Sequence, residues 1–509
     1  MTALPSLARV PNGGTTPLGD VPRLKIDAFR EAIAGGIPGG RLVSLFGMPE
    51  RHDRLRLIAV LAPPGERALA VTSTEVEERY PALTVLLPQA HLFEREIAEQ
   101  WGVRPEGHPW LKPVRYHRSY RPGRDAWNRR ESDPLIPGFT DFFEVAGEEV
   151  HEVGVGPVHA GVIEPGHFRF QCHGERVIHL EIALGYQHRG VERSLEGGPD
   201  KRTIHRIETI AGDTAVGHAL AHSQLIEALS GTEVPPRGQA IRSVALELER
   251  LANHAGDLGA LSGDVGYLPA ASFCGRLRGD LLNLTLLACG SRMGLGWVRP
   301  GGIGFGIDFE PETQRRISYS LPLAISDLER SFGLMRANST VRARFEETGA
   351  LPRVTCEELG IVGVAARASG LERDVRRDLP LGRYVEAPIA CATWSSGDVF
   401  ARARVRWEEC AISSAHILET LRSLPRGVSR REPGPLEPSS FAVSLVEGWR
   451  GEICHTAVTD ERGRFRRYKI VDPSFHNWMG LAMAMRDQPI SDFPLCNKSF
   501  NLSYSGHDL

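Results

Sequence analysis

The sequence predicts an α+β protein built from two domains, and three observations support this prediction. Between residues 42 and 73, short apolar runs alternate with turn residues, which is typical of strands. From residue 204 onward, apolar residues recur at helical spacing, which favours a helical bundle. The chain has 509 residues, more than one hydrophobic core usually serves, so a division into domains is expected.

The first part of the chain predicts a small α+β domain over residues 21–118. Residues 1–20 are rich in Pro, Gly and Thr, and we expect a flexible N-terminus there. The runs L-V-S-L-F-G-M, L-R-L-I-A-V-L-A and R-A-L-A-V-T-S then indicate strands, with the turn signal A-P-P-G-E-R between the last two. The stretch H-L-F-E-R-E-I-A-E-Q-W over residues 91–101 indicates a helix.

Residues 119–150 are charged and broken by Pro and Gly, so we expect a linker before a second domain over residues 151–509. That domain opens with two extended runs in H-F-R-F-Q-C-H-G-E-R-V-I-H-L-E-I-A. The clearest helix is Q-A-I-R-S-V-A-L-E-L-E-R-L-A-N-H-A-G-D-L-G, where apolar residues follow i, i+3, i+4, i+7 spacing. Further helices are predicted over residues 204–230, 272–292, 312–335 and 399–423.

Composition narrows the class of function. The net charge of −3 gives no strongly basic field, so we expect no nucleic-acid partner. No apolar run reaches the roughly 18 residues that a membrane-spanning helix needs, and the N-terminus lacks a signal-peptide pattern. None of the eight cysteines forms a C-x-x-C pair, so we expect no zinc or iron–sulfur cluster held by the chain's own thiols.

Two segments combine residue types that carry chemistry. G-P-V-H-A-G-V-I-E-P-G-H-F-R-F contains His159 and His167, and G-Y-Q-H-R-G-V-E-R contains His188, Arg189 and Glu192. Taken alone, each histidine also fits a structural hydrogen bond, and a buried Arg–Glu neighbourhood also fits an ion-pair network.

The order of these motifs resembles a known family. From about residue 154 to the C-terminus, the chain resembles the large subunit of membrane-bound, energy-converting (group 4, formate hydrogenlyase-type) nickel–iron hydrogenases. It also resembles the related 49-kDa-type subunit of respiratory complex I. Residues 88–115, with E-R-E-I and G-H-P, resemble the 30-kDa-type subunit, as in the C/D-type chains that fuse the two. The motifs that carry the resemblance of the second domain are E-P-G-H-F-R-F, H-R-G-V-E, E-V-P-P-R-G-Q-A-I-R, L-E-R-L-A-N-H-A-G-D-L-G, R-P-G-G-I and A-R-A-S-G-L-E-R-D-V-R-R-D.

The resemblance implies a hydrogenase-large-subunit-like helical bundle with peripheral strands, but the metal positions depart from the family pattern. Hydrogenases of this kind hold nickel and iron with four cysteines in two C-x-x-C motifs. Here D-T-A-V-G-H-A-L-A-H-S places Ala215 and His218 at the first pair, and S-F-N-L-S-Y-S-G-H-D-L places Ser503 and Gly506 at the second. Because soft thiolates are what these metals require, we expect no nickel–iron centre.

The quinone-binding pattern of the complex I subunit is also altered. Its second headgroup histidine falls near Pro165, which His159 and His167 flank, and its tyrosine falls near Asp200. Asp264 aligns with an acidic residue that faces the quinone cavity. The resemblance thus implies a pocket for protons or a quinone. We expect His159, His167, Asp264 and Glu192 to line it, together with the positions where the metal-binding cysteines are missing.

Two further roles follow from the resemblance. Glu192 matches a glutamate that passes protons to and from the metal, and the alternative is a salt bridge with Arg189 or Arg193. His188 and Arg189 match residues that face the nearest iron–sulfur cluster of a small partner subunit.

Three functions remain open from the sequence. The first is an electron-transfer subunit on the cytoplasmic side of a membrane complex, with a 4Fe–4S small subunit, a ferredoxin-like subunit and antiporter-like membrane subunits as partners and a quinone as candidate acceptor. The second is a non-catalytic scaffold of such a complex. The third is a different metal held by His218 and His507, which lacks the further ligands that such a site needs.

Overall fold

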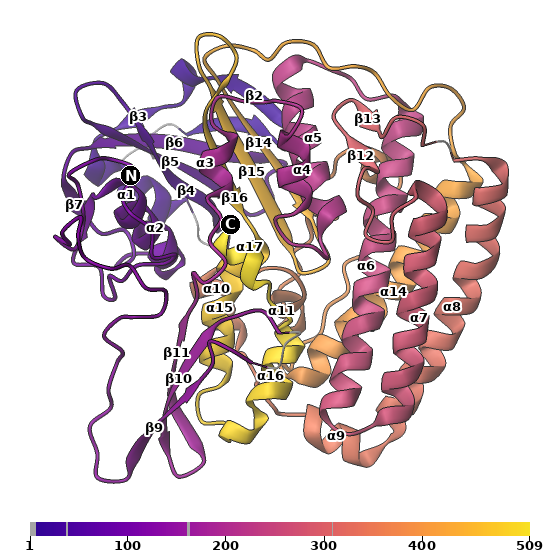
Figure 1. The fold of residues 1–509 in the computed structure, drawn as a ribbon. Helices are drawn as coiled ribbons and strands as arrows, with labels where there is room; N and C mark the ends of the chain where they lie inside the picture. Colours follow the sequence, from indigo (N-terminus) through magenta and orange to yellow (C-terminus); the bar gives the residue numbers. More distant parts are fainter. Residues whose placement is uncertain (1–6, 37–38, 160–162, 308) are drawn as a thin grey trace.

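The computed structural model describes residues 7–36, 39–159, 163–307 and 309–509. Three parts lie side by side: an N-terminal sheet with its helices, a central sheet above the C-terminal helices, and a bundle of long helices (Figure 1). The α+β class predicted from the sequence is confirmed.

The N-terminal part contains a five-stranded sheet in the order β1-β6-β5-β4, with β3 parallel to β6. The apolar runs form its three long strands, and the predicted helix α2 (His91–Trp101) ends at Gly102, whose φ of 65° suits glycine. The elements of this part are β1 (Ala8–Pro11), β3 (Arg23–Leu24), α1 (Ile26–Gly35), β4 (Arg41–Pro49), β5 (Leu55–Ala62), β6 (Ala68–Val76), β7 (Arg79–Pro81), η2 (Pro88–Ala90) and β8 (Arg104–Glu106).

The prediction of a flexible N-terminus is wrong from Ala8 onward. Strand β1 pairs with β6, whereas β2 (Gly14–Pro17) pairs with β14 (Ser440–Glu447) of the second domain, and η1 (Leu18–Asp20) follows. Between the strands, the Asn12 side chain donates to the carbonyls of Leu379 and Leu445. The prediction failed because this segment is ordered by backbone hydrogen bonds to strands far along the chain. Its own composition carries no sign of these bonds. Residues 1–6 lie outside the described part.

The central sheet has the order β16-β15-β14-β2, with β15 (Glu452–Thr459) and β16 (Phe465–Val471) buried along almost their whole length. One face packs on the N-terminal sheet, and a single hydrophobic cluster holds Phe46 and Ile58 together with Phe441 and Val443. Helix α5 (Ala215–Ser230) contacts β14 and β15. The two parts therefore share one core.

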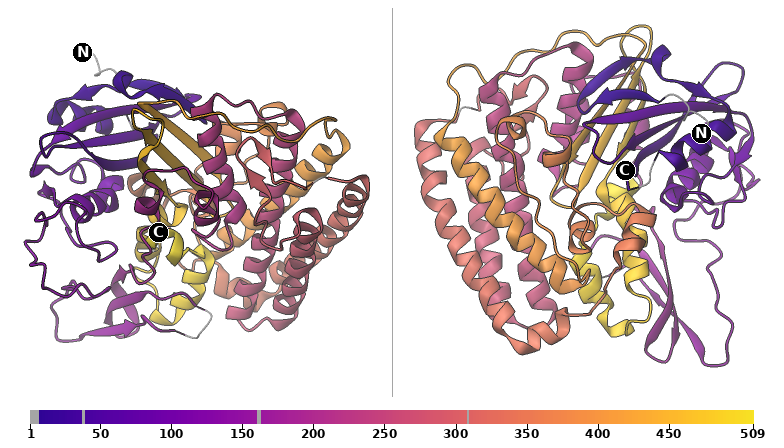
Figure 2. Two further views of the ribbon diagram at one scale, coloured as in Figure 1. Left: turned by 45° about the horizontal axis from the view of Figure 1, so that its top comes forward. Right: turned by 180° about the vertical axis from the view of Figure 1, so that it is seen from behind.

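Residues 119–149, all of them described, contain no helix or strand, and the last residue of the predicted linker, Val150, begins the next strand. After them, β9 (Val150–Val155), β10 (His167–His173) and β11 (Arg176–Ala183) form an antiparallel sheet. This sheet projects from the rest of the molecule in the front view (Figure 1) and in the view from behind (Figure 2).

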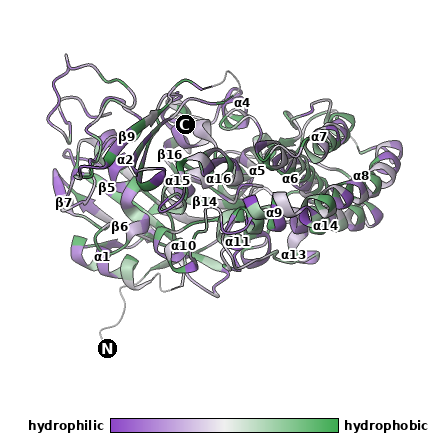
Figure 3. Cartoon of the chain, turned by 90° about the horizontal axis from the view of Figure 1, so that it is seen from below, coloured by the Kyte–Doolittle hydropathy of each residue, from purple (hydrophilic) through white to green (hydrophobic). Residues whose placement is uncertain are grey.

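The bundle consists of α6 (Pro236–Asp264), α7 (Leu268–Cys289), α8 (Pro311–Ala337) and α14 (Val399–Arg422), which match the predicted helices. Hydrophobic residues gather between these helices and hydrophilic ones on their outer faces (Figure 3). The predicted helix over 204–230 is broken into α4 (Thr203–Glu208) and α5. Within the described ranges, no helix has the length and apolar character needed to cross a bilayer.

Short elements complete the second domain. They are α3 (Val191–Leu195), β12 (Val298–Arg299), β13 (Gly302–Ile303), α9 (Ser339–Phe345), α10 (Arg353–Leu359), α11 (Gly363–Ala368), α12 (Val375–Asp378), α13 (Arg383–Glu386), α15 (Pro473–Ala484), η3 (Ile490–Asp492), α16 (Phe493–Phe500) and α17 (Tyr504–Asp508).

Candidate functional site

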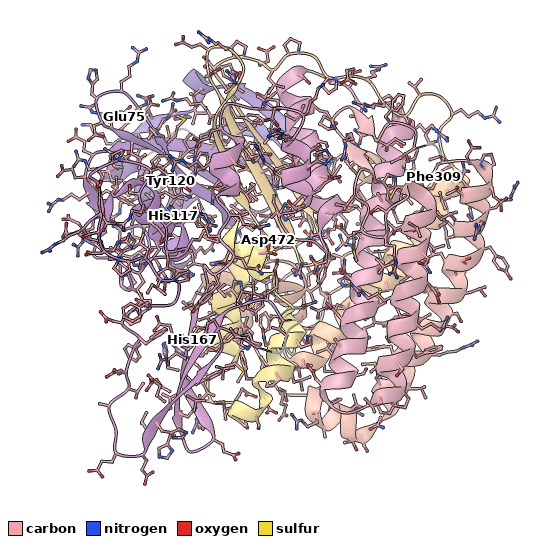
Figure 4. All side chains as sticks on the ribbon, in the orientation of Figure 1. Glu75, His117, Tyr120, His167, Phe309 and Asp472 are labelled. Atoms are coloured by element: carbon pink, nitrogen blue, oxygen red, sulfur yellow. The ribbon has the colours of Figure 1, made fainter. Side chains whose placement is uncertain are left out.

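Three of the four positions of the missing cysteines meet around one carboxylate, that of Asp472. This residue lies at the centre of the molecule, between the central sheet and the C-terminal helices (Figure 4). It caps the N-terminus of α15, where its Oδ1 accepts from the Ser474 amide at 2.8 Å and Pro473 opens the helix. Its Oδ2 lies 3.1 Å from Nε2 of His218 on α5, and both side chains are buried.

The C-terminal tail closes on the same carboxylate. Ser503 caps α17 by accepting from the Gly506 amide at 2.9 Å, and its own amide donates to the Ser474 hydroxyl at 2.8 Å. A Cβ added to Gly506 would lie 2.6 Å from Cγ of Asp472. Three of the four predicted positions therefore surround Asp472, while Ala215 lies one turn before His218 on α5.

These residues do not fit a nickel–iron centre. No thiolate is present at the four positions, and the Asp472 carboxylate lies where a side chain at Gly506 would have to go. The two histidines of the alternative metal hypothesis do not converge either: His218 contacts Asp472 and His455, whereas His507 contacts Asp508. Among the described residues, no three His, Cys, Asp or Glu side chains are placed to hold a metal ion.

Glu192 lies apart from these positions, in a buried ion-pair network. Its carboxylate contacts Lys469 at 2.9 Å and Arg467 at 3.0 Å, and it accepts from the Ile470 amide at 3.0 Å. Burial by itself would raise the pKa of Glu192, but the charges of Lys469, Arg467 and Arg115 outweigh burial and hold this pKa well below its usual range. An ionised, fully paired carboxylate suits an ion pair better than a proton carrier.

The expected partners of Glu192 were wrong. Arg189 donates instead to the carbonyls of Thr209 and Ile210, and the Arg193 guanidinium lies over the Tyr120 ring. The true partners are about 275 residues away in the sequence, so spacing alone could not identify them.

The remaining predicted pocket residues lie in two other places. His159 Nε2 contacts the Gly166 carbonyl at 2.9 Å, and His167 Nδ1 contacts the Gly156 carbonyl at 3.1 Å. These two hydrogen bonds stabilise the backbone at the start of β10. Asp264 is exposed at the end of α6, where burial of part of its carboxyl raises its pKa. Among the described residues, the hydrogen bonds and ion pairs of Glu192 include none to His159, His167 or Asp264.

A cavity of about 720 Å³ lies elsewhere, between α2, residues 108–116, β11 and α15. Its walls are largely apolar and include Leu92, Trp110, Trp478 and Met483, with His507 among the polar lining residues. A volume and lining of this kind are typical of a small-molecule site.

His188 and Arg189 belong to a surface cluster at the tail. The His188 ring stacks on His117 with centroids 4.8 Å apart, and His117 stacks on Tyr120 at the same distance. His188 Nδ1 contacts the Asp508 carbonyl at 2.8 Å, and the Arg189 amide donates to the Leu509 carbonyl at 2.9 Å. We call His117, Arg118, Tyr120, His188, Arg189 and Arg193 the histidine–arginine face; they line one shallow depression.

Comparison with known proteins gives two family matches. Residues 31–132 match the family described as respiratory-chain NADH dehydrogenase, 30 Kd subunit, and residues 264–508 match the 49 Kd subunit. Formate hydrogenlyase subunit 5 of Escherichia coli is 28% identical over 92% of this chain and 85% of its own length. The C/D subunit of NADH-quinone oxidoreductase from Bacteroides thetaiotaomicron is 26% identical over 76% of this chain and 78% of its own length.

A solved structure shares the fold. It is a chain of the membrane-bound sulfane sulfur reductase, an archaeal respiratory membrane complex, with a TM-score of 0.66 and 23% identity. The match covers 72% of this chain and all of the other chain.

Proposed function

The chain is a fused 30-kDa/49-kDa-type subunit of the hydrogenase and NADH dehydrogenase family, and from this premise we propose that it transfers electrons without a nickel–iron centre. In this proposal it docks on a 4Fe–4S small subunit at the cytoplasmic side of a membrane complex. Ferredoxin-like and antiporter-like subunits complete that complex. Its relatives are subunits of hydrogenase and NADH-quinone oxidoreductase complexes, which supports this class of function.

The observation that carries the docking proposal is the histidine–arginine face. Arg193 is exposed, and together with Arg118 and Arg189 it makes this face cationic. A thiolate-ligated cluster is anionic, so such a face complements it, and hydrogen bonds and charge near a cluster tune its potential. The stacked His188 and His117 rings place two imidazoles at the centre of the same face.

We assign the candidate quinone-like acceptor to the cavity beside His507, away from the degenerate metal positions. The packed carboxylate of Asp472 supports this choice, because it lies against Gly506 where a ligand would need room. An apolar ring compound suits walls that include Trp110 and Trp478. A quinone analogue should quench tryptophan fluorescence, and Met483→Trp, which fills the cavity, should abolish that binding.

The second candidate is a scaffold that only holds its partners together. The tight contact between Asp472 and Gly506 favours this candidate, since a filled site needs no ligand.

The test uses the chain co-purified with its small subunit. Arg193→Glu should weaken docking about tenfold or more, in a salt-dependent manner, because it reverses one charge of the face. Arg330→Glu on the outer side of α8, an equally exposed arginine, serves as the matched control. Unchanged docking in Arg193→Glu would refute the interface.

A redox titration then separates the two candidates. If the chain transfers electrons, His188→Ala shifts the reduction potential of the partner's cluster and leaves docking intact. If the chain is a scaffold, His188→Ala changes neither the potential nor docking. Stoichiometric nickel in the purified complex would contradict both.

A further inference from the structure

Five buried side chains form an unbroken chain of hydrogen-bonding groups through the centre of the protein. From Asp472 Oδ2, the chain runs 3.1 Å to His218 Nε2, and from His218 Nδ1 it runs 3.1 Å to His455 Nε2. His455 Nδ1 lies 2.8 Å from the Tyr468 hydroxyl, and His222 Nδ1 lies 2.8 Å from the same hydroxyl. None of the five is more than 2% exposed.

The chemistry of each member fixes the direction of all four hydrogen bonds. An ionised Asp472 can only accept, so His218 donates from Nε2 and its Nδ1 must accept from His455. His455 then accepts at Nδ1 from the Tyr468 hydroxyl. Since that hydroxyl has a single proton, His222 must donate to it from Nδ1 and keep Nε2 unprotonated. Every donor thus points toward Asp472.

We propose that these five hydrogen-bonded side chains form a proton relay. The relay carries a proton from the surface to Asp472 through His222, Tyr468, His455 and His218. One proton binds at His222 Nε2, and each hydrogen-bonded proton moves one position along the chain. One proton arrives at Asp472 Oδ2, so a single proton enters, a single proton is delivered and no electron moves. Afterwards all four bonds are intact with their direction reversed.

The two ends of the relay support this direction. His222 lines a surface depression together with Asp200, Lys201 and Arg206, which connects that end to solvent. Asp472 lies against Gly506, at the place where the family carries its metal.

The pKa shifts agree with an uncharged His222, His455 and Tyr468 and an ionised Asp472. Burial lowers the pKa of His222 to about 3 and holds that of His455 well below its usual value, while burial raises the pKa of Tyr468 well above 10. Burial would raise the pKa of Asp472, but the hydrogen bond that His218 donates and the charge of Arg450 lower it. Charged groups that act on the relay include Arg450 and Asp213 near Asp472, and Arg299 near His222.

The relay gives the proposed electron-transfer subunit a proton acceptor that can be loaded while the core stays closed. The role of the relay in electron transfer rests on the proposed function. The relay itself does not, because all five of its side chains belong to this polypeptide. Measurements on the isolated full-length chain therefore test the relay whether or not docking on an iron–sulfur partner is found.

The first measurement needs no substitution in the relay. In protein labelled with ¹⁵N-histidine, long-range ¹H–¹⁵N spectra should show His222 protonated at Nδ1 and both His218 and His455 protonated at Nε2. If Asp472 is protonated, all three tautomers should be reversed together. A mixed pattern, or an imidazolium at neutral pH, would overturn the proposal.

The second measurement breaks the relay in the middle. Tyr468→Phe keeps the ring and removes the hydroxyl, so exchange of the His218 ring N–H with solvent should slow about tenfold or more. Tyr384→Phe, which removes another buried tyrosine hydroxyl that donates to Glu247, is the control and should leave this exchange unchanged. If His218 exchanges only as slowly as the buried Ser474 amide in the wild type, or if Tyr468→Phe has no effect, the relay is refuted.

Discussion

Gly506→Ala should destabilise the protein, although it adds one methyl group to a helical glycine. The new Cβ would lie 2.6 Å from Cγ and 2.7 Å from Oδ2 of Asp472, closer than nonbonded atoms approach. Forced overpacking in a core costs about 1–3 kcal/mol. Moving Asp472 also weakens its charged hydrogen bond to His218, which is worth about 1.5–3 kcal/mol. Alanine regains about 1 kcal/mol of helix propensity, so the expected net loss is about 3 kcal/mol.

Urea unfolding followed by tryptophan fluorescence measures this loss. The Trp478 ring lies 4.9 Å from that of Tyr504, so it reports on the tail that carries Gly506. Gly275→Ala on α7 is the control, because nothing lies within 4 Å of its added Cβ, and it should be neutral or stabilising.

A double-mutant cycle identifies the cause of the loss. If Asp472 is the obstacle, Gly506→Ala should cost about 2 kcal/mol less in an Asp472→Ala background than in the wild type. An equal cost in both backgrounds, or a cost below about 1 kcal/mol in the wild type, would refute the reasoning that this carboxylate occupies the family's metal position.

Two further substitutions test the buried carboxylates. Glu192→Gln should lower the free energy of unfolding by about 3–5 kcal/mol, because it leaves Arg467 and Lys469 under-compensated in the core; a loss below about 1 kcal/mol would contradict the ion-pair role. Burial raises the pKa of Glu249 to about 8, so between its unfolded pKa of about 4.5 and this value the native state holds a proton that the unfolded state has lost, and stability falls as pH rises. Glu249→Gln should remove this slope, which unfolding midpoints at about pH 6 and pH 9 would show, whereas equal slopes in both proteins would contradict the raised pKa.

The sequence identified the features that depend on local pattern. Helix α2 and the four bundle helices follow from apolar spacing, and the strands β4, β5, β6, β10 and β11 follow from short apolar or extended runs. The strands β1 and β2 were missed because their partners, β6 and β14, lie far along the chain and their own composition gives no apolar run.

The candidate site divides in the same way. The missing thiolates are a property of residue identity, so the sequence alone could argue against a nickel–iron centre. The sequence could not show that the Asp472 carboxylate lies at the family's metal position, because Asp472 and His218 are 254 residues apart in the chain. The segment D-P-S at residues 472–474 has the pattern of a helix N-cap followed by proline, but this pattern predicts only where a helix starts.

By itself, then, the sequence determined the element types, the joining of the two family domains and the loss of the metal ligands, since each depends on residues that are neighbours or on residue identity. Only the tertiary structure decided that Glu192 is an ion-pair carboxylate, that the open cavity lies beside His507, and that three histidines and a tyrosine line up behind Asp472. The physical reason is that hydrogen bonds and ion pairs depend on distances of about 3 Å. These distances arise when α5 packs on β14 and β15, which brings His222 to Tyr468 of β16, and no local pattern encodes that contact.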